Sequence, residues 1–254
     1  MGQAKENGGF QVKKRDISSA GLHLLAMFFM LLDHLWATVV PGNDWLTCIG
    51  RLAFPIFAFL IVEGYFHTKS VKKYMLRLLL CAIVSEIPFN LMYAGRMFYP
   101  LHQNVLWSFL IALILICWNG EMRRGKLWRR CLRGAVSILL GFVIGTVTMV
   151  DYYGYGIVMV LVFYFFHGRD WWQILGQIAG LYWINVEMMG GLVYEFDLLG
   201  RNWVIHQQGL ALLALIPIFL YRGRKGNQTA AFRLFCYLFY PAHMLLLALL
   251  RSGW

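Results

Sequence analysis

An aspartate and a histidine stand side by side, as Asp33 and His34, inside an apolar run that extends from Leu22 to Val40. Ionisable side chains at bilayer depth are costly and are usually retained for function, so this pair is the first candidate site. A histidine close to a carboxylate can act as a general base or handle protons. The structural alternative is a buried pair that only ties helices together.

The whole chain has the composition of a membrane protein. Its 254 residues are 60% hydrophobic and only 14% charged, whereas soluble domains are roughly 45–50% apolar and about 25% charged. The mean hydropathy is +0.60. We therefore expect an all-α integral membrane protein, with a flexible basic cytoplasmic tail (1–18) and a single polytopic transmembrane domain (19–254). The first apolar segment is too long for a cleavable signal peptide, so the tail should stay attached.

Charge and cysteine usage exclude several other classes. A net charge of +11 would suggest nucleic acid as the partner of a soluble protein, but the basic residues here follow a membrane topology, so we expect none. The five cysteines lie singly, without a C-x-x-C motif, which predicts free thiols and neither a disulfide framework nor a metal site. Membrane lipids are the expected surroundings, and the sequence leaves the oligomeric state open.

Nine hydrophobic segments are long enough to cross or partly cross a bilayer, which takes about 20 residues, or fewer where neighbours shield a short helix. Their ranges are 20–40, 45–66, 72–94, 103–119, 132–150, 153–167, 170–189, 204–221 and 231–250. With the N-terminus inside, the inner segments hold 18 of the 23 basic residues and the outer segments three. This bias predicts nine helices, a cytoplasmic N-terminus and an extracytoplasmic C-terminus, with a pair of half-helices as the alternative around 150–170. The spacings Gly141/Gly145 and Gly176/Gly180 predict close helix packing.

Helix rise places several ionisable residues at one depth. At about 1.5 Å per residue, Asp33, His34 and Glu86 lie roughly 20 Å from the inner edge of the membrane, and His243 lies about 18 Å from it. Arg51 lies about 9 Å below the outer edge. These five residues from four helices are therefore predicted to share a layer. Adjacent residues on a helix point about 100° apart, so Asp33 is not expected to orient His34, and Glu86 or Arg51 could pair with either.

Further polar residues border this layer and outline a cavity that faces outward. They are Gln103, Asn104, Asp151, Tyr152, His206, Gln207 and Gln208. Of these, His206 could also be a wet loop residue. Glu63 and His67, four residues apart on the inner end of the second helix, could line an entrance from the cytoplasm. A layer of this kind is typical of either a reaction centre or a transport site.

Several motifs stand out along the chain. They are Leu31-Leu32-Asp33-His34, Ile49-Gly50-Arg51-Leu52-Ala53-Phe54-Pro55 continuing to Glu63-Gly64, His67-Thr68, Ser85-Glu86-Ile87-Pro88-Phe89-Asn90, Gln103-Asn104-Val105 and Phe239-Tyr240-Pro241-Ala242-His243. Together these motifs resemble the TraX family over residues 20–250. That family is named for a membrane acetylase of the conjugative pilin N-terminus. It resembles the transmembrane acyltransferases, in which acetyl-CoA from the cytoplasm modifies an acceptor and a histidine near the first helix is the base or acyl carrier. The resemblance places that role on His34.

The resemblance implies an acetyltransferase in the bacterial cytoplasmic membrane. His34 would deprotonate an acceptor amine or hydroxyl, or carry the acetyl group itself, while Arg51 or Asn104 would stabilise the oxyanion. The acceptor is left open, as a peptide or pilin N-terminus, a small molecule or a surface glycan. The phosphates of acetyl-CoA would be held by bases on the inner face: Lys72, Lys73, Arg77, Arg222 and Arg224. A funnel past Glu63 and His67 should admit part of the donor.

Two other classes of protein remain. A proton-coupled transporter also needs buried histidines and carboxylates, although the chain shows no inverted halves with paired broken helices. A non-catalytic membrane partner in surface-structure assembly is the third class.

Overall fold

The computed structural model describes residues 16–120, 126–198 and 200–251, so most of the predicted tail (1–18) lies outside the described residues. Within these ranges, five helical stretches are long and apolar enough to cross a membrane. They are α1 (Ser19–Thr38), α2 and α3 together (Asp44–Gly50 and Ala53–His67), α4 (Val71–Ala94), α6 (Leu127–Val147) and α10 (Ala230–Arg251). The protein is therefore a mostly helical, multi-pass membrane protein.

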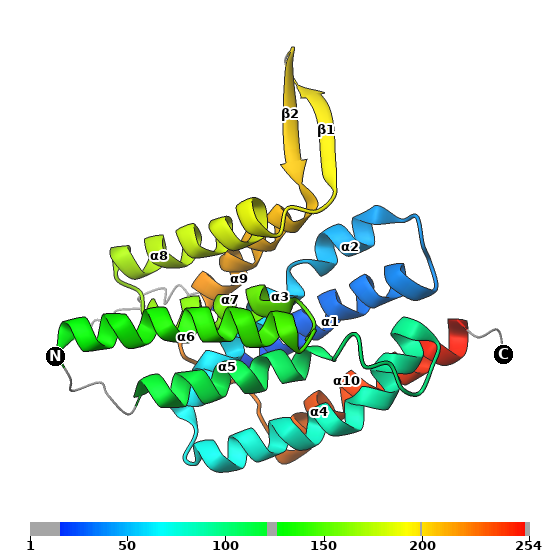
Figure 1. Ribbon diagram of the computed structural model, residues 1–254. Coiled ribbons are helices and arrows are strands. Elements are labelled where there is room, and N and C mark those ends of the chain that lie inside the picture. Colours follow the sequence, from blue (N-terminus) through cyan, green and yellow to red (C-terminus); the bar gives the residue numbers. More distant parts are fainter. Residues whose placement is uncertain (1–15, 121–125, 199, 252–254) are drawn as a thin grey trace, which may run out of the picture.

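The shorter helices are α5 (Val105–Gly120), α7 (Tyr153–Phe165), α8 (Trp171–Tyr182) and α9 (Leu215–Leu220). The long axes of most helices run in a similar direction (Figure 1). The core contains α3 and α7, where Ile56, Ile157 and Met159 are fully buried. A helix as short as α7 is tolerated at the centre because protein surrounds it on every side.

Glycines set the distance between α7 and its two neighbours. A Cβ atom added to Gly154 would lie 2.3 Å from the carbonyl oxygen of Phe142, and one added to Gly141 would lie 2.7 Å from Ile157. A Cβ atom added to Gly180 of α8 would lie 2.7 Å from the side chain of Val162 on α7. The close packing predicted from the glycine spacings is confirmed on both α6 and α8.

A two-stranded antiparallel sheet corrects the prediction of a purely helical chain. Strand β1 (Val193–Leu198) pairs with β2 (Arg201–His206), and the hairpin projects away from the helices (Figure 1). Gly200, with φ +72°, supplies the left-handed turn conformation. The predicted eighth helix (204–221) therefore begins in a strand and continues as the 3₁₀ segment η2 (Gln207–Ala214) before α9.

Two other predicted helices are interrupted. The second (45–66) breaks into α2 and α3 at Arg51 and Leu52, and the seventh (170–189) ends in the π-helical segment η1 (Trp183–Met188). Breaks and π-helical turns inside helices are frequent at functional sites, because they redirect side chains that a regular helix would carry elsewhere. The break at Arg51 lies beside Asp33 of α1.

The helices α1, α4, α6 and α10 begin at the same end of the bundle, which we call the basic end. Backbone hydrogen bonds from Ser19 to Arg224 and from Ala20 to Lys225, 2.8 and 3.1 Å long, tie the start of α1 to the loop before α10. Basic residues cluster near these helix starts, Lys72, Lys73, Arg129 and Arg130 among them. Asp33, His34 and His243 lie deep in the bundle, well beyond this end.

Candidate active site

Two imidazoles from opposite ends of the sequence are in contact. Nδ1 of His34, on α1, lies 2.8 Å from Nε2 of His243, on α10. The rings are nearly parallel, with an interplanar angle of 6° and centroids 5.0 Å apart. His243 is buried, and the ring of Phe239 stacks on it at 4.8 Å. The pair combines two of the predicted catalytic residues in one hydrogen bond.

The direction of this hydrogen bond follows from the other nitrogen of His243. Nδ1 of His243 lies 2.7 Å from the carbonyl oxygen of Phe239, which can only accept, so Nδ1 carries the proton. In neutral His243, Nε2 is then the acceptor, and His34 donates from its own Nδ1. The proton-free nitrogen of neutral His34 is therefore Nε2, and no hydrogen bond within the described residues occupies it. His34 is held in the tautomer that a general base requires.

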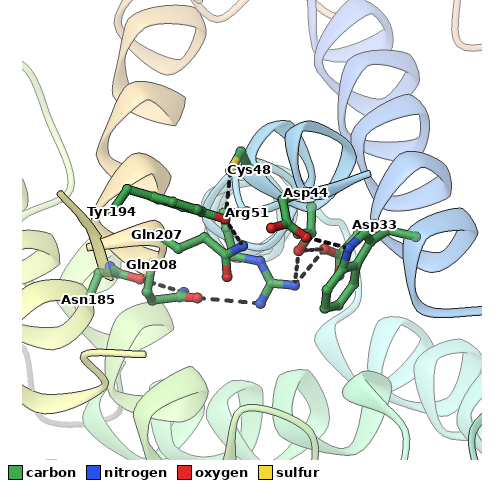
Figure 2. A network of polar contacts seen from close by, with 10 residues as sticks. Asp33, Asp44, Cys48, Arg51, Asn185, Tyr194, Gln207 and Gln208 are labelled. Atoms are coloured by element: carbon green, nitrogen blue, oxygen red, sulfur yellow. Dashed lines mark hydrogen bonds and ion pairs between the residues drawn. The ribbon is translucent and has the colours of Figure 1, made fainter. Parts of the chain in front are cut away.

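Asp33 takes part in a different network, whose members include residues of α2 and the break that follows it (Figure 2). Its Oδ1 atom accepts from Arg51 at 2.5 Å and from the Thr47 hydroxyl at 2.7 Å, and Arg51 also donates to Thr47. A Cβ added to Gly50 would lie 2.5 Å from Cβ of Asp33, so only glycine lets α2 approach α1 this closely. The carboxylate and the guanidinium therefore neutralise each other.

The same network extends from Arg51 toward the hairpin. The second nitrogen of the guanidinium donates to Gln208 at 3.4 Å, and Gln208 donates to Asn185 at 2.9 Å (Figure 2). Tyr194 of β1 accepts from Gln207 at 3.0 Å and from the Cys48 thiol of α2 at 3.6 Å, which fixes the base of the hairpin beside α2. Gln207 and Gln208 were predicted border residues, whereas Thr47, Asn185 and Tyr194 are members of this network that the candidate residues from the sequence did not include.

Glu86 pairs with neither Arg51 nor His34. Its Oε2 atom accepts from the Asn104 amide at 2.5 Å and from the Trp107 indole at 3.0 Å, while its buried Oε1 atom has no partner among the described residues. Asn104 also donates to the Ala82 carbonyl at 3.0 Å. Glu86 and Asn104 thus join α4 to α5. Of the two residues expected to pair with Asp33 or His34, Arg51 pairs with Asp33 and Glu86 pairs with neither.

The predicted border residues 103 and 151–152 meet in a strained bend between α6 and α7. Tyr152 and Tyr153 have φ values of +60° and +47°, which L residues seldom adopt. Asp151 lies 3.4 Å from His102, and Tyr152 stacks on Phe54 at 4.1 Å. His34 lies within electrostatic range of both Asp151 and Asp33. The bend therefore places the acid Asp151 within electrostatic range of His34.

Two other predicted border residues do not reach this layer with their side chains. Gln103 contributes its backbone to the bend, with its N–H on Met149, and its side chain turns to Pro100. His206 ends β2, and its buried Nδ1 atom has no partner among the described residues.

A cavity of about 520 Å³ extends from the basic end toward the imidazole pair. On α1 it is lined by Ser19, His23, Met27 and Met30, and on α10 by Phe232, Arg233, Cys236, Tyr237, Phe239 and Tyr240. Residues three and four apart share a helix face, so His34 continues the lining face of α1 and His243 that of α10. Both imidazoles lie one turn beyond the last lining residue of their helix.

Glu63 and His67 lie on the wall of this cavity, as the funnel prediction requires. Glu63 is buried, and its Oε1 atom lies 2.7 Å from Nε2 of His167. Its other oxygen lies 3.6 Å from the His67 ring, and Tyr221 hydrogen-bonds to the same carboxylate. His167 and Tyr221 are partners that the candidate residues from the sequence did not include.

The bases at the cavity differ from most of those predicted to hold a donor. Arg77 lines it and donates to Tyr237 at 3.4 Å, and Lys225 and Arg233 line it as well. Four predicted bases do not line it: Lys72, Lys73, Arg222 and Arg224. Arg224 instead pairs with Asp16 at 2.8 Å. Among the described residues, no group of three or more His, Cys, Asp or Glu side chains is placed to hold a metal ion.

These features define a class: a helical, multi-pass membrane protein with a buried histidine pair beyond a cavity that opens among basic residues. Within that class the chain belongs to the TraX family, because the family model described as TraX protein matches residues 18–251. The chain is also similar to a protein of Dichelobacter nodosus named "Probable fimbrial assembly protein FimC, serogroup H1". The two are 26% identical over 249 residues, which cover 91% of this chain and 95% of that protein. No solved structure matches the chain significantly.

Proposed function

We propose that this protein is an integral-membrane acetyltransferase, which moves an acetyl group from acetyl-CoA to an amine or hydroxyl of an acceptor. One observation carries the proposal: the helix faces of α1 and α10 that line the cavity continue into His34 and His243. A long flexible donor entering at the basic end would be led to the only nitrogen of the pair that is ready to accept a proton. Family membership supports the same reaction class.

The proposed topology puts the basic end in the cytoplasm, because positively charged residues gather on that side of membrane proteins. The relative from a bacterium supports the bacterial cytoplasmic membrane as the location. The α1 face from Ser19 to Met30 is about 16 Å long, and one further turn to His34 adds about 6 Å. A pantetheine arm of roughly 15–20 Å would span most of that distance. Arg77, Lys225 and Arg233 would hold the donor's phosphates.

In the proposed reaction, His34 Nε2 accepts the proton of the acceptor amine or hydroxyl as the acceptor forms a bond to the thioester carbon. His243 keeps the ring in place and shares the charge of the imidazolium through the Nδ1–Nε2 hydrogen bond. Arg51 would donate to the oxyanion from Nε, which is buried and has no partner among the described residues, since the amide of Asn104 already donates to Glu86 and Ala82. When the carbon–sulfur bond breaks, His34 returns the proton to the departing CoA thiolate.

The acceptor should approach from the end of the bundle opposite to the cavity, where Asp151 and Tyr152 lie. A polypeptide N-terminus is one acceptor that fits, and the name of the D. nodosus relative favours a fimbrial subunit over a sugar polymer. An amine nucleophile would reach His34 within the field of Asp151, which suits a group that develops positive charge during attack.

The proposal is tested with purified protein in lipid vesicles and acetyl-CoA labelled on the acetyl group. Release of free CoA together with transfer of label to a supplied peptide amine, or to water in its absence, is the expected result. Accumulation of a solute in the vesicles with no loss of acetyl-CoA would instead identify a transporter.

Cys81 and Cys236 line the cavity, so acetyl-CoA should slow their alkylation by a maleimide, whereas the exposed Cys131 should react at an unchanged rate.

A further inference from the structure

A second cavity, of about 590 Å³, lies at the basic end of α5, α6 and α7. Its α6 wall consists of Leu127, Arg130, Cys131, Arg133, Gly134, Ala135 and Ile138. The opposite wall is aromatic, with Phe66, Tyr164, Phe165 and Phe166. None of the residues proposed for acetyl transfer lies in it.

The charged residues that line this cavity in the described part of the chain are both arginines. Arg130 and Arg133 lie on its α6 wall, and no carboxylate occurs among the described residues that line it. Arg133 is fixed in position, because it donates to the Trp118 carbonyl at 2.7 Å and its guanidinium lies 4.6 Å from the centre of the Trp118 ring. Two arginines one turn apart on a helix can hold a phosphate group between them.

The apolar part of the cavity faces outward along α6. Leu127 is 71% exposed and Ile138 38% exposed, although both are on a helix that is long enough to span the membrane. Further along the same helix, Leu139, Val143 and Val147 are also exposed. An occupant with a charged head at the arginines could therefore continue as an apolar chain along α6, which is the shape of a membrane lipid.

Contacts between α3 and the chain after α7 separate this cavity from the donor cavity. His167 lines the second cavity, and its ring stacks on Phe66 at 4.1 Å. The same histidine contacts Glu63, which lines the donor cavity. A CoA molecule in the second cavity would therefore lie behind this wall and could not present its thioester to His34.

We propose that the second cavity binds an anionic phospholipid of the membrane leaflet at the basic end, with the phosphate at Arg130 and Arg133 and an acyl chain against Leu127 and Ile138. Phosphatidylglycerol is a suitable probe, because it carries a net negative charge, and phosphatidylcholine is the matched neutral control. Lipid binding at this cavity is measured without acetyl-CoA. The result is therefore independent of whether the protein transfers acetyl groups.

The test measures thermal unfolding of the full chain in neutral detergent while short-chain lipid is added. Phosphatidylglycerol should raise the unfolding midpoint of the wild type and of Arg129→Gln, and phosphatidylcholine should raise it less. Arg130→Gln should lose most of this extra shift. Arg129 and Arg130 are both exposed, so both variants should fold, and they remove the same charge from adjacent positions.

Three results would overturn the proposal. An equal loss in Arg129→Gln and Arg130→Gln would show only a general attraction to the basic end. Equal shifts with the two lipids would show that charge is not recognised. A shift of the same size with inorganic phosphate alone would show a free-anion site without a role for the acyl chain.

Discussion

Asp33 and His34 are adjacent in sequence, but they belong to two regions of opposite character. Asp33 faces α2 and is neutralised by Arg51 and Thr47 in a network that continues to Gln208 and Asn185. His34 faces α10 and has one partner, His243, which leaves Nε2 without a hydrogen bond in the described part of the chain. The first region has its main charges paired, whereas the second keeps one basic atom available.

This difference shows how one costly pair of residues in an apolar helix can serve two purposes. Ion pairs that also accept hydrogen bonds hold helices in one arrangement, and removing one partner leaves a buried charge. A neutral imidazole pair costs less to bury and still changes protonation easily. We therefore assign the joining of α1 to α2 mainly to Asp33 and Arg51, and proton transfer to His34.

Arg51→Gln should produce the largest loss of stability, because it leaves the Asp33 carboxylate with Thr47 as its remaining strong donor. We expect a loss of about 3 kcal/mol, at the low end for breaking a buried ion pair. The yield of monodisperse protein and the unfolding midpoint in detergent measure it. Arg129→Gln, on the exposed surface of α6, is the control and should unfold like the wild type. Equal midpoints for the two variants would show that the Asp33 network is not structural.

His243→Ala should lower turnover roughly 10²-fold, because the His34 ring loses the partner that fixes its tautomer and position. The protein should still fold, since a neutral side chain is removed. His243→Gln should recover at least tenfold of that loss, because its amide oxygen can accept from His34 Nδ1. Steady-state turnover on labelled acetyl-CoA measures both variants. If His243→Gln were as inactive as His243→Ala, the acceptor role of His243 would be wrong.

Glu86→Gln should have the smallest effect, below about 1 kcal/mol in stability, because a glutamine oxygen can accept from Asn104 and Trp107 as the carboxylate does. Glu86→Ala should reduce folded yield, since it leaves the Trp107 indole and one N–H of Asn104 unpaired, whereas Lys126→Ala should not. A large loss in Glu86→Gln would mean that the charge of Glu86, and not only its oxygen, is needed.

Helix positions could be predicted from the sequence, because apolar side chains mark the segments long enough to span a membrane. Relative position along a helix followed from the rise per residue, which the backbone fixes. The predicted spans 20–40, 72–94 and 231–250 differ from α1, α4 and α10 by at most two residues at either end. Depth alone grouped His34 with His243, 209 residues away, and the two side chains are in contact.

Direction around each helix axis could not be predicted in the same way, because it depends on which helices are neighbours. Glu86 was predicted to share the layer of His34, yet α4 turns it toward Asn104 and Trp107. One signal was present: the α1 cavity residues 19, 23, 27 and 30 follow helical spacing that leads to position 34. The hairpin also had a signal, since Glu195 and Asp197 alternate with apolar residues, a period-2 pattern.

Comparing His34→Asn with Asp33→Asn tests the central claim most directly. Asparagine at 34 keeps a donor near the position of Nδ1 but has no counterpart of Nε2, whereas asparagine at 33 keeps an acceptor for Thr47 and Arg51. With labelled acetyl-CoA and equal amounts of folded protein, we predict that His34→Asn loses roughly 10²- to 10⁴-fold in turnover, and that Asp33→Asn unfolds more easily but loses less than tenfold. Full activity in His34→Asn, or equal inactivation of both folded variants, would contradict the account.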